Sequence, residues 1–198
     1  RPGKASAEPP GAPATMARAL EPQELDQRRN ALASGLAALS ESLAGRFVLN
    51  DVLRCALDTL HASLQCRRVL FAVRDAKGEA LNGRFAAGDL ENDRLRMFRI
   101  VLDDEGNLLS AAARKGADLL ISDAGAANVA GRVPAWYRQH YTAGSFLLLP
   151  VMINGSPKGM IYADSAQTGG LQIEDAALAL VRGIRNQVVM ALRQSIAP

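Results

Sequence analysis

The sequence predicts an α+β domain in which long N- and C-terminal helices cover one face of a central antiparallel sheet and short helices and loops cover the other. A stripe of leucines near the N-terminus and a similar stripe in the last 25 residues both have helical spacing, and short apolar segments lie between them. We place this domain at residues 22–198. Residues 1–21 are rich in Pro, Ala and Gly, which predicts a disordered segment or linker.

Two helices are expected at the start of the domain. Leucines 25, 32, 36, 39 and 43 follow one another in steps of 7, 4, 3 and 4 residues, which is heptad spacing, and Gly45 ends the pattern. A second helix is expected to begin near Asn50, with an apolar face running from Val52 to Leu64.

The middle of the chain predicts short strands alternating with helices. A helix at 108–115 would be capped by Asp103 or Asp104 and stopped by Gly116. Residues 124–141 lack periodicity and are expected to be irregular. The other elements predicted here are strands at 68–75, 80–87, 98–102 and 119–122 and a short helix at 90–97.

A β-hairpin is the clearest local prediction. Residues 145–153 (SFLLLPVMI) and 158–164 (KGMIYAD) are apolar, and Asn154-Gly155 between them favours a type I′ turn, in a loop that we expect to be slightly longer because Ser156 and Pro157 follow. Strands that are apolar on both faces must lie in the middle of a sheet. The closing helix is expected at 173–195, again with heptad spacing of its apolar residues.

Composition argues against several classes of function. The net charge of +3 comes from 23 basic residues, 19 of them Arg, which are scattered among acidic ones, so we expect no nucleic-acid partner. No apolar run approaches the roughly 20 residues of a membrane helix, and we expect a soluble, cytoplasmic chain. Cys55 and Cys66 form no CxxC pair and predict buried free thiols rather than a metal site.

The hairpin resembles that of GAF domains, which end their sheet with a serine, a Pro-containing apolar strand, a Gly-bearing turn and a Gly-led strand. Ser145, Pro150, Gly155 and Gly159 stand at these positions. Residues 66–75 resemble the first GAF strand, and 119–123 resemble the segment that enters the pocket-side loop. The resemblance implies a bacterial regulatory domain with end helices that often pair in dimers. The string Arg132–Tyr137 further resembles GAF-type regions that follow HDOD domains.

Departures from particular GAF types narrow the expected chemistry. The NKFDE-like signature of the phosphodiesterase type is absent from the sequence. Cys55 and Cys66 precede the pocket-side region, where bilin-binding GAF domains and GAF-type methionine sulfoxide reductases place their cysteines. We therefore expect no catalytic residue, no cofactor, no metal and no enzyme activity.

Seven residues are candidates for binding a small molecule between the sheet and residues 124–141. For all of them except Asp123 a purely structural role stays open: Arg74 and Arg84 as strand residues facing water, the aromatic residues as loop anchors, and Tyr162 as part of the core. His140 follows the aromatic cluster and could also reach a pocket. The candidates are Arg74, Arg84, Asp123, Trp136, Tyr137, Tyr141 and Tyr162.

Three functions follow from these observations. The first is a regulatory domain that senses an unidentified small molecule and signals through its terminal helices, as a homodimer and beside an N-terminal partner domain. The second is a ligand-free dimerisation module of a larger signalling protein. The third and least favoured is a thiol-based reductase, which would require a cysteine in the pocket.

Overall fold

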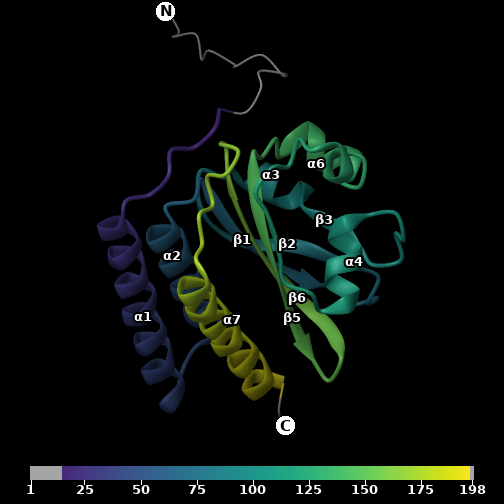
Figure 1. Cartoon of the computed structure of the whole chain (residues 1–198). Coiled ribbons are helices and arrows are strands. Elements are labelled where there is room, and N and C mark those ends of the chain that lie inside the picture. The colour runs from purple at the N-terminus through teal and green to yellow at the C-terminus, as the bar shows by residue number, and fades with distance from the viewer. Residues whose placement is uncertain (1–14, 197–198) are drawn as a thin grey trace, which may run out of the picture.

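Six antiparallel strands form one curled sheet in the computed structural model, which describes residues 15–196 (Figure 1). Their order across the sheet is β3-β2-β1-β6-β5-β4. The β5–β6 hairpin therefore lies inside the sheet, as its apolar sequence predicts. The strands are β1 (Arg68–Arg74), β2 (Ala80–Gly88), β3 (Arg99–Val101), β4 (Leu119–Ile121), β5 (Ser145–Ile153) and β6 (Ser156–Ser165).

Seven helices cover the two faces of this sheet (Figure 1). The three long ones pack on one face and the four short ones lie on the other, so the predicted fold class is confirmed. The helices are α1 (Pro22–Ala44), α2 (Leu49–Leu64), α3 (Asn92–Met97), α4 (Leu108–Lys115), α5 (Ala127–Ala130), α6 (Ala135–His140) and α7 (Asp175–Ile196). Among the described helices, none combines the length and apolar character that a membrane crossing requires.

Alternation along the central strands divides the core into two halves. Because successive side chains of a strand point to opposite faces, Phe71 and Ile161 pack beneath α1, α2 and α7, whereas Leu70 and Tyr162 pack beneath the short helices. The register sets Arg68 beside Asp164, on the face of the short helices. This alternation determines which residues can meet at a site on either face.

Four local predictions from the sequence are wrong. Asn107 caps α4, because its Oδ1 accepts the Leu109 backbone N–H at 2.9 Å, while Asp103 and Asp104 precede the cap. Residues 124–141 contain α5 and α6 rather than irregular chain only. The hairpin turn has just two residues, since the strands resume at Ser156 after Asn154 and Gly155, both at positive φ. Cys55 is exposed, not buried.

The segment before α1 is fastened to the loop before α7. The Ala17 N–H donates to the Thr168 carbonyl at 2.9 Å, and the Thr168 N–H donates to the Thr15 carbonyl at 3.1 Å. The Gln172 side chain accepts from the Leu20 N–H at 2.9 Å and donates to the Arg18 carbonyl at 2.6 Å. These contacts place the start of α1 next to the start of α7. Of the predicted linker at residues 1–21, residues 1–14 lie outside the part of the chain that the structure describes.

Candidate functional site

Six aromatic side chains gather on the sheet face opposite the long helices. Helix α6 and its C-cap supply three of them, β5 and β6 supply one each, and the residue after α3 supplies the last. Ring centroids lie between 5.1 and 6.3 Å apart, mostly in the edge-to-face or tilted arrangements that aromatic rings prefer. We call this group the aromatic cluster: Phe98, Trp136, Tyr137, Tyr141, Phe146 and Tyr162.

A chain of hydrogen bonds leads from the aromatic cluster to a buried ion pair. The hydroxyls of Tyr137 and Tyr162 lie 3.0 Å apart, and Tyr162 Oη donates to Asp164 Oδ2 at 2.6 Å. The same carboxylate accepts from Arg68 Nε at 2.7 Å and from Arg67 Nε at 3.2 Å. Asp164 and Arg68 are almost completely buried, so each charge depends on the other.

Tyr141 connects three elements around this ion pair. Its backbone carbonyl accepts from Nη2 of both Arg67 (2.9 Å) and Arg68, and the Arg68 guanidinium lies over its ring, 4.5 Å from the centroid. Its hydroxyl donates to the carbonyl of Arg94 on α3 at 2.9 Å. Tyr141 therefore fixes the end of α6 to both β1 and α3.

Burial sets the protonation states of these groups. It raises the pKa of Tyr137, Tyr141 and Tyr162 well above their usual value of 10.0, so all three phenols stay neutral and can donate hydrogen bonds. Burial, the largest single influence, would lower the pKa of Arg68, but the Asp164 carboxylate together with Tyr162 and Tyr141 outweighs it and raises that pKa. The site therefore offers a fixed ion pair and neutral hydroxyls, and no group that titrates near pH 7 among these four residues.

The four aromatic candidates predicted from the sequence lie together in this cluster. Tyr137, Tyr141 and Tyr162 are buried, and Trp136 is half-buried against Phe98. Five cavities of the described residues are lined by residues outside the cluster. The rings of Tyr137 on α6 and of Phe146 and Tyr162 on the sheet pack directly against one another.

The three polar candidates lie elsewhere. Arg74 is at the opposite end of β1 from Arg68, where it donates to the Gly78 carbonyl and to Ser156 Oγ. Asp123 is exposed, and its Oδ1 accepts the Gly125 N–H at 2.9 Å. Arg84 is exposed and lines a surface cavity of about 260 Å³ together with Arg96. Their roles in ligand binding stay predictions.

The half-buried Arg67 and the buried Arg68 and Asp164 are site residues that the sequence reasoning did not select. A signal was present, because Arg67-Arg68 is one of the two densest basic pairs and directly precedes an apolar strand. Tyr162 and Asp164 are two apart in β6 and share a face. The antiparallel register that sets Arg68 beside Asp164 was not predictable from either strand alone.

The two cysteines lie away from the aromatic cluster. Cys66 belongs to the core beneath the long helices, and burial raises the pKa of its thiol to about 12. Cys55 is on α2 and lines a surface cavity with Phe47 and Asp51. No group of three or more His, Cys, Asp or Glu residues within 15–196 is placed to hold a metal ion.

Comparison with known proteins identifies relatives of this fold. The family model described as GAF domain matches residues 48–192, whereas no curated protein sequence matches the chain. Among solved structures, the GAF domain of a phosphoenolpyruvate-protein phosphotransferase from Coxiella burnetii has a TM-score of 0.68 at 11% identity, covering 84% of this chain and 95% of its own. The corresponding domain from Acinetobacter has a TM-score of 0.64 at 13% identity, covering 90% and 99%.

The similar structures include enzymes. Free methionine-R-sulfoxide reductase from Neisseria meningitidis, solved with its substrate, has a TM-score of 0.65 at 18% identity and covers 92% of this chain and 99% of its own. Identities this low establish a shared fold and no shared activity.

Proposed function

This chain belongs to the GAF domain family, and we propose that it is a non-catalytic regulatory domain that senses a small molecule between α6 and the sheet and signals through its terminal helices. GAF domains are in general regulatory sensor modules. The observation that carries the proposal is the hydrogen-bonded chain from Tyr137 on α6 through Tyr162 to Asp164, near the end of β6.

This chain of contacts continues toward α7. Ser145 Oγ donates to the Gln167 carbonyl at 2.9 Å and accepts the Leu171 N–H at 3.2 Å, which ties the loop after β6 to β5. The loop leads into α7, and α7 packs on α1 and α2. A ligand that displaces α6 would free the donors of Arg67 and Arg68 from the Tyr141 carbonyl and so disturb the end of β6.

The cluster also defines what such a ligand would resemble. It must fill the volume that the Trp136 and Tyr137 side chains vacate when α6 is displaced. It must also give the Tyr162 hydroxyl a hydrogen-bond partner, since a buried polar group without one costs about 1–3 kcal/mol. A planar apolar molecule with one hydroxyl or carbonyl group meets both requirements.

Trp136 provides a direct test because it is the chain's single tryptophan and lies on α6. We expect a metabolite of this kind to change tryptophan emission saturably and to raise the unfolding temperature. Hydrogen exchange of amides 135–141 should change with the same midpoint. Unchanged emission and unfolding temperature across a broad metabolite library would overturn ligand sensing.

The dense packing of the aromatic cluster favours a second candidate function, a ligand-free dimerisation module. Met190 on α7 is 47% exposed and Leu43 on α1 is half-buried, so the helix layer keeps apolar surface for a symmetric partner. Native mass spectrometry should then find a dimer that Met190→Glu weakens. A monomer at all accessible concentrations contradicts this candidate.

Two finer assignments belong with this proposal. A reductase role would need a reactive thiol at the aromatic cluster, but Cys66 is buried on the other face of the sheet, so we propose that the chain is not an enzyme. Cys55→Ser and Cys66→Ser variants with lower reductase activity than the parent would overturn this.

Residues 132–137 support membership of the HDOD-associated GAF type, which the sequence of the full gene would test.

A further inference from the structure

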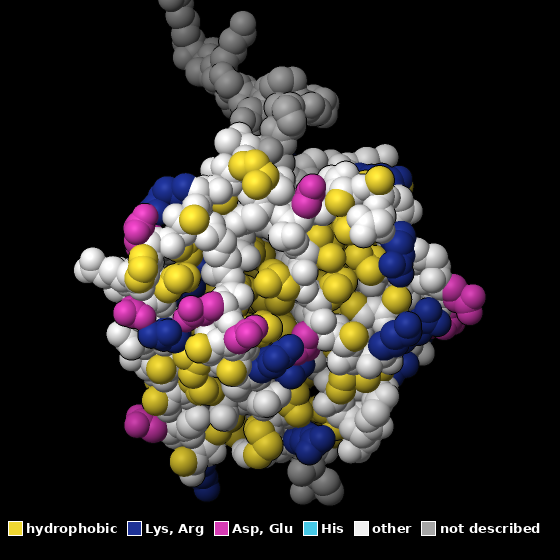
Figure 2. Space-filling view, viewed as in Figure 1, with side chains coloured by type: hydrophobic (Ala, Val, Ile, Leu, Met, Phe, Trp, Pro, Cys, Tyr) yellow, Lys and Arg dark blue, Asp and Glu magenta, His cyan; other side chains and the backbone are white. Residues whose placement is uncertain are grey.

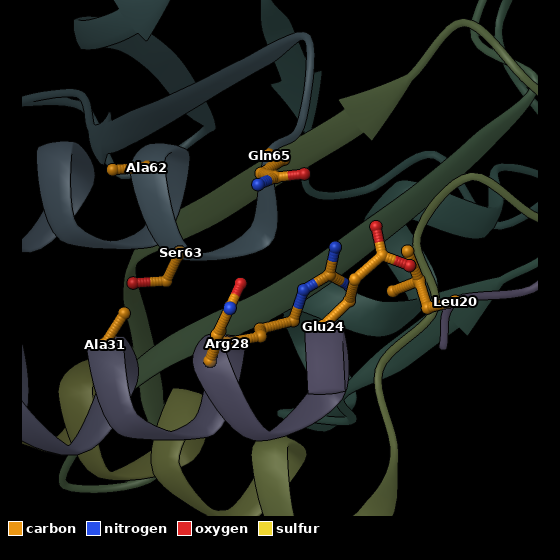
Figure 3. A pocket seen from close by; sticks show the side chains of 8 residues that line it. Leu20, Glu24, Arg28, Ala31, Ala62, Ser63 and Gln65 are labelled. Carbon is orange, nitrogen blue, oxygen red and sulfur yellow. The ribbon is translucent and has the colours of Figure 1, made fainter. Parts of the chain in front are cut away.

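A cavity of about 230 Å³ lies between the start of α1 and the end of α2, on the helix face of the sheet (Figure 3). One water molecule needs only roughly 10–15 Å³ of such volume, so the cavity can hold a small organic molecule. Its walls include Leu20, Glu24, Arg28, Ala31, Ser63 and Gln65. It lies on the opposite side of the sheet from the aromatic cluster.

Arg28 is a buried cation in the wall of this cavity. It is 7% exposed, and its one hydrogen bond to a described residue runs from Nη1 to the Gln172 carbonyl at 2.5 Å. No carboxylate of the described residues lies within ion-pair distance of it. Because a guanidinium carries five donors, most of its donors are free, and in Figure 3 it points into the space between α1 and the Gln65 end of α2. Burial lowers the pKa of Arg28, as expected for a charge without a close counter-ion.

Glu24 is at the edge of the cavity, but its negative charge is already balanced by an ion pair. Its carboxylate is held by Arg18 at 2.5 and 2.8 Å and accepts the backbone N–H of Glu21 at 2.9 Å. The Arg18–Glu24 pair therefore adds no net charge, and Arg28 supplies the one uncompensated charge of the cavity wall. A monoanion balances this single positive charge, whereas a dianion would leave one negative charge uncompensated in the cavity.

Ser63 adds a second buried polar group to the same wall. It is 6% exposed, and its hydroxyl has no hydrogen bond with any residue in the described part of the chain. No fully buried side-chain nitrogen or oxygen within residues 15–196 lacks a hydrogen-bond partner, so the free donors of Arg28 and the Ser63 hydroxyl open onto the cavity that they line, where a ligand can bond to them.

We propose that this cavity is a binding site for a small carboxylate, whose oxygens accept from the free donors of Arg28 while the Ser63 hydroxyl donates to the bound molecule. The planar fork of a guanidinium matches the two oxygens of a carboxylate. Through Arg28 and the Gln172 carbonyl, the bound anion strengthens the contact between α1 and the loop before α7. The site is independent of the proposed function, because no residue of the aromatic cluster contributes to it.

NMR titration of the full chain with sodium acetate or propionate tests the proposal, with sodium chloride at equal ionic strength as the reference. We expect saturable shifts at the Arg28 side chain and at the amides of residues 31, 63 and 65. Arg28→Met should weaken binding at least tenfold, and Arg28→Lys should have a smaller effect because it keeps the charge. The matched control is Arg29→Met, since Arg29 is paired with Asp26 and Glu174 and should bind as the parent does.

Ser63→Ala keeps the test decisive if the Arg28 variants fold poorly. It should fold with unchanged stability, since it breaks no hydrogen bond within the described chain, and bind carboxylate about fivefold more weakly. Shifts identical to those of chloride, undiminished binding by Arg28→Met or Ser63→Ala, or a clear preference for inorganic phosphate would each overturn the assignment. Trp136 emission should stay constant throughout, which separates this result from the test at the aromatic cluster.

Discussion

The Tyr162 hydroxyl donates a 2.6 Å hydrogen bond to Oδ2 of Asp164, two residues further along β6 on the same face of the sheet. That oxygen also accepts from Arg68 Nε, and the other oxygen accepts from Arg67 Nε. A carboxylate with no exposure to solvent needs such donors to remain charged. The strength of this arrangement can be measured one residue at a time.

Asp164→Asn should destabilise the domain by about 3–5 kcal/mol, because it leaves the buried Arg68 guanidinium without a counter-charge. Urea unfolding followed by circular dichroism measures the loss. The control is Asp26→Asn, which breaks an exposed ion pair with Arg29 on α1 and should cost less than about 1 kcal/mol. Equal losses in the two variants would contradict a structural role for the buried pair.

Tyr162→Phe should cost more stability than Tyr137→Phe. The Tyr162 hydroxyl donates to a charged acceptor, which is worth about 1.5–3 kcal/mol, whereas the Tyr137 hydroxyl bonds only to another phenol, worth about 1 kcal/mol. Urea unfolding of both single variants and the double variant gives the two losses and their coupling energy. The reverse order would contradict the greater strength of the bond to Asp164, and strictly additive losses would show that the two hydroxyls act independently.

Periodicity in the sequence predicted the fold well because the long elements carry strong, regular patterns. The β5–β6 hairpin and the helices α1, α2 and α7 are close to their predicted limits. Helix α6 was missed because its six residues are too short for a periodic pattern. The α4 cap was misassigned because Asp103, Asp104 and Asn107 are all good capping residues, and only Asn107 reaches the first turn.

Only part of the candidate site was predictable, because some of its residues stand out in the sequence and others meet only in the folded chain. Tyr137, Tyr141 and Tyr162 stand out as amphipathic aromatics in a chain with only 5% aromatic residues. Arg68 and Asp164 are 96 residues apart and meet only through the β1–β6 register, which no local pattern encodes. The scattered charge was visible in the sequence, and on the face shown in Figure 2 basic side chains lie at several separate places, several of them beside acidic ones.

Cys55 should react with a thiol reagent in the folded protein, and Cys66 should not. Cys55 is exposed on α2, while burial raises the pKa of Cys66 to about 12 and keeps its thiol protonated. Mass spectrometry after labelling at pH 8 should find one modified thiol per chain, and two after labelling in urea. Cys55→Ser should abolish labelling of the folded protein; rapid labelling of that variant would contradict the burial of Cys66.

Cys66 should also make stability fall at alkaline pH. The pKa of its thiol is about 12 in the folded chain against 9.0 when unperturbed, so above pH 9.0 the unfolded chain releases a proton that the folded chain retains. The contribution is fully present below pH 9.0 and is lost as the pH rises toward about 12. The buried tyrosines act in the same direction, so the measurement is the difference in slope between the parent and Cys66→Ala. Parallel pH profiles above pH 9.0 would refute the assignment to Cys66.

Gly159 should tolerate no side chain, although it lies in an otherwise apolar strand. A Cβ at this position of β6 would come within 2.6 Å of the Phe71 ring and 2.7 Å of the Ala72 carbonyl oxygen on the neighbouring strand β1. Because the carbonyl belongs to the sheet backbone and cannot move freely, Gly159→Ala should cost about 1–3 kcal/mol in urea unfolding. The control is Gly45→Ala after α1, where a Cβ meets no atom within 4 Å and φ is negative. That variant should be neutral or up to about 1 kcal/mol more stable, because it restricts the unfolded chain. Equal effects of the two substitutions on stability would contradict the explanation that the close approach of β6 to Phe71 requires glycine at position 159.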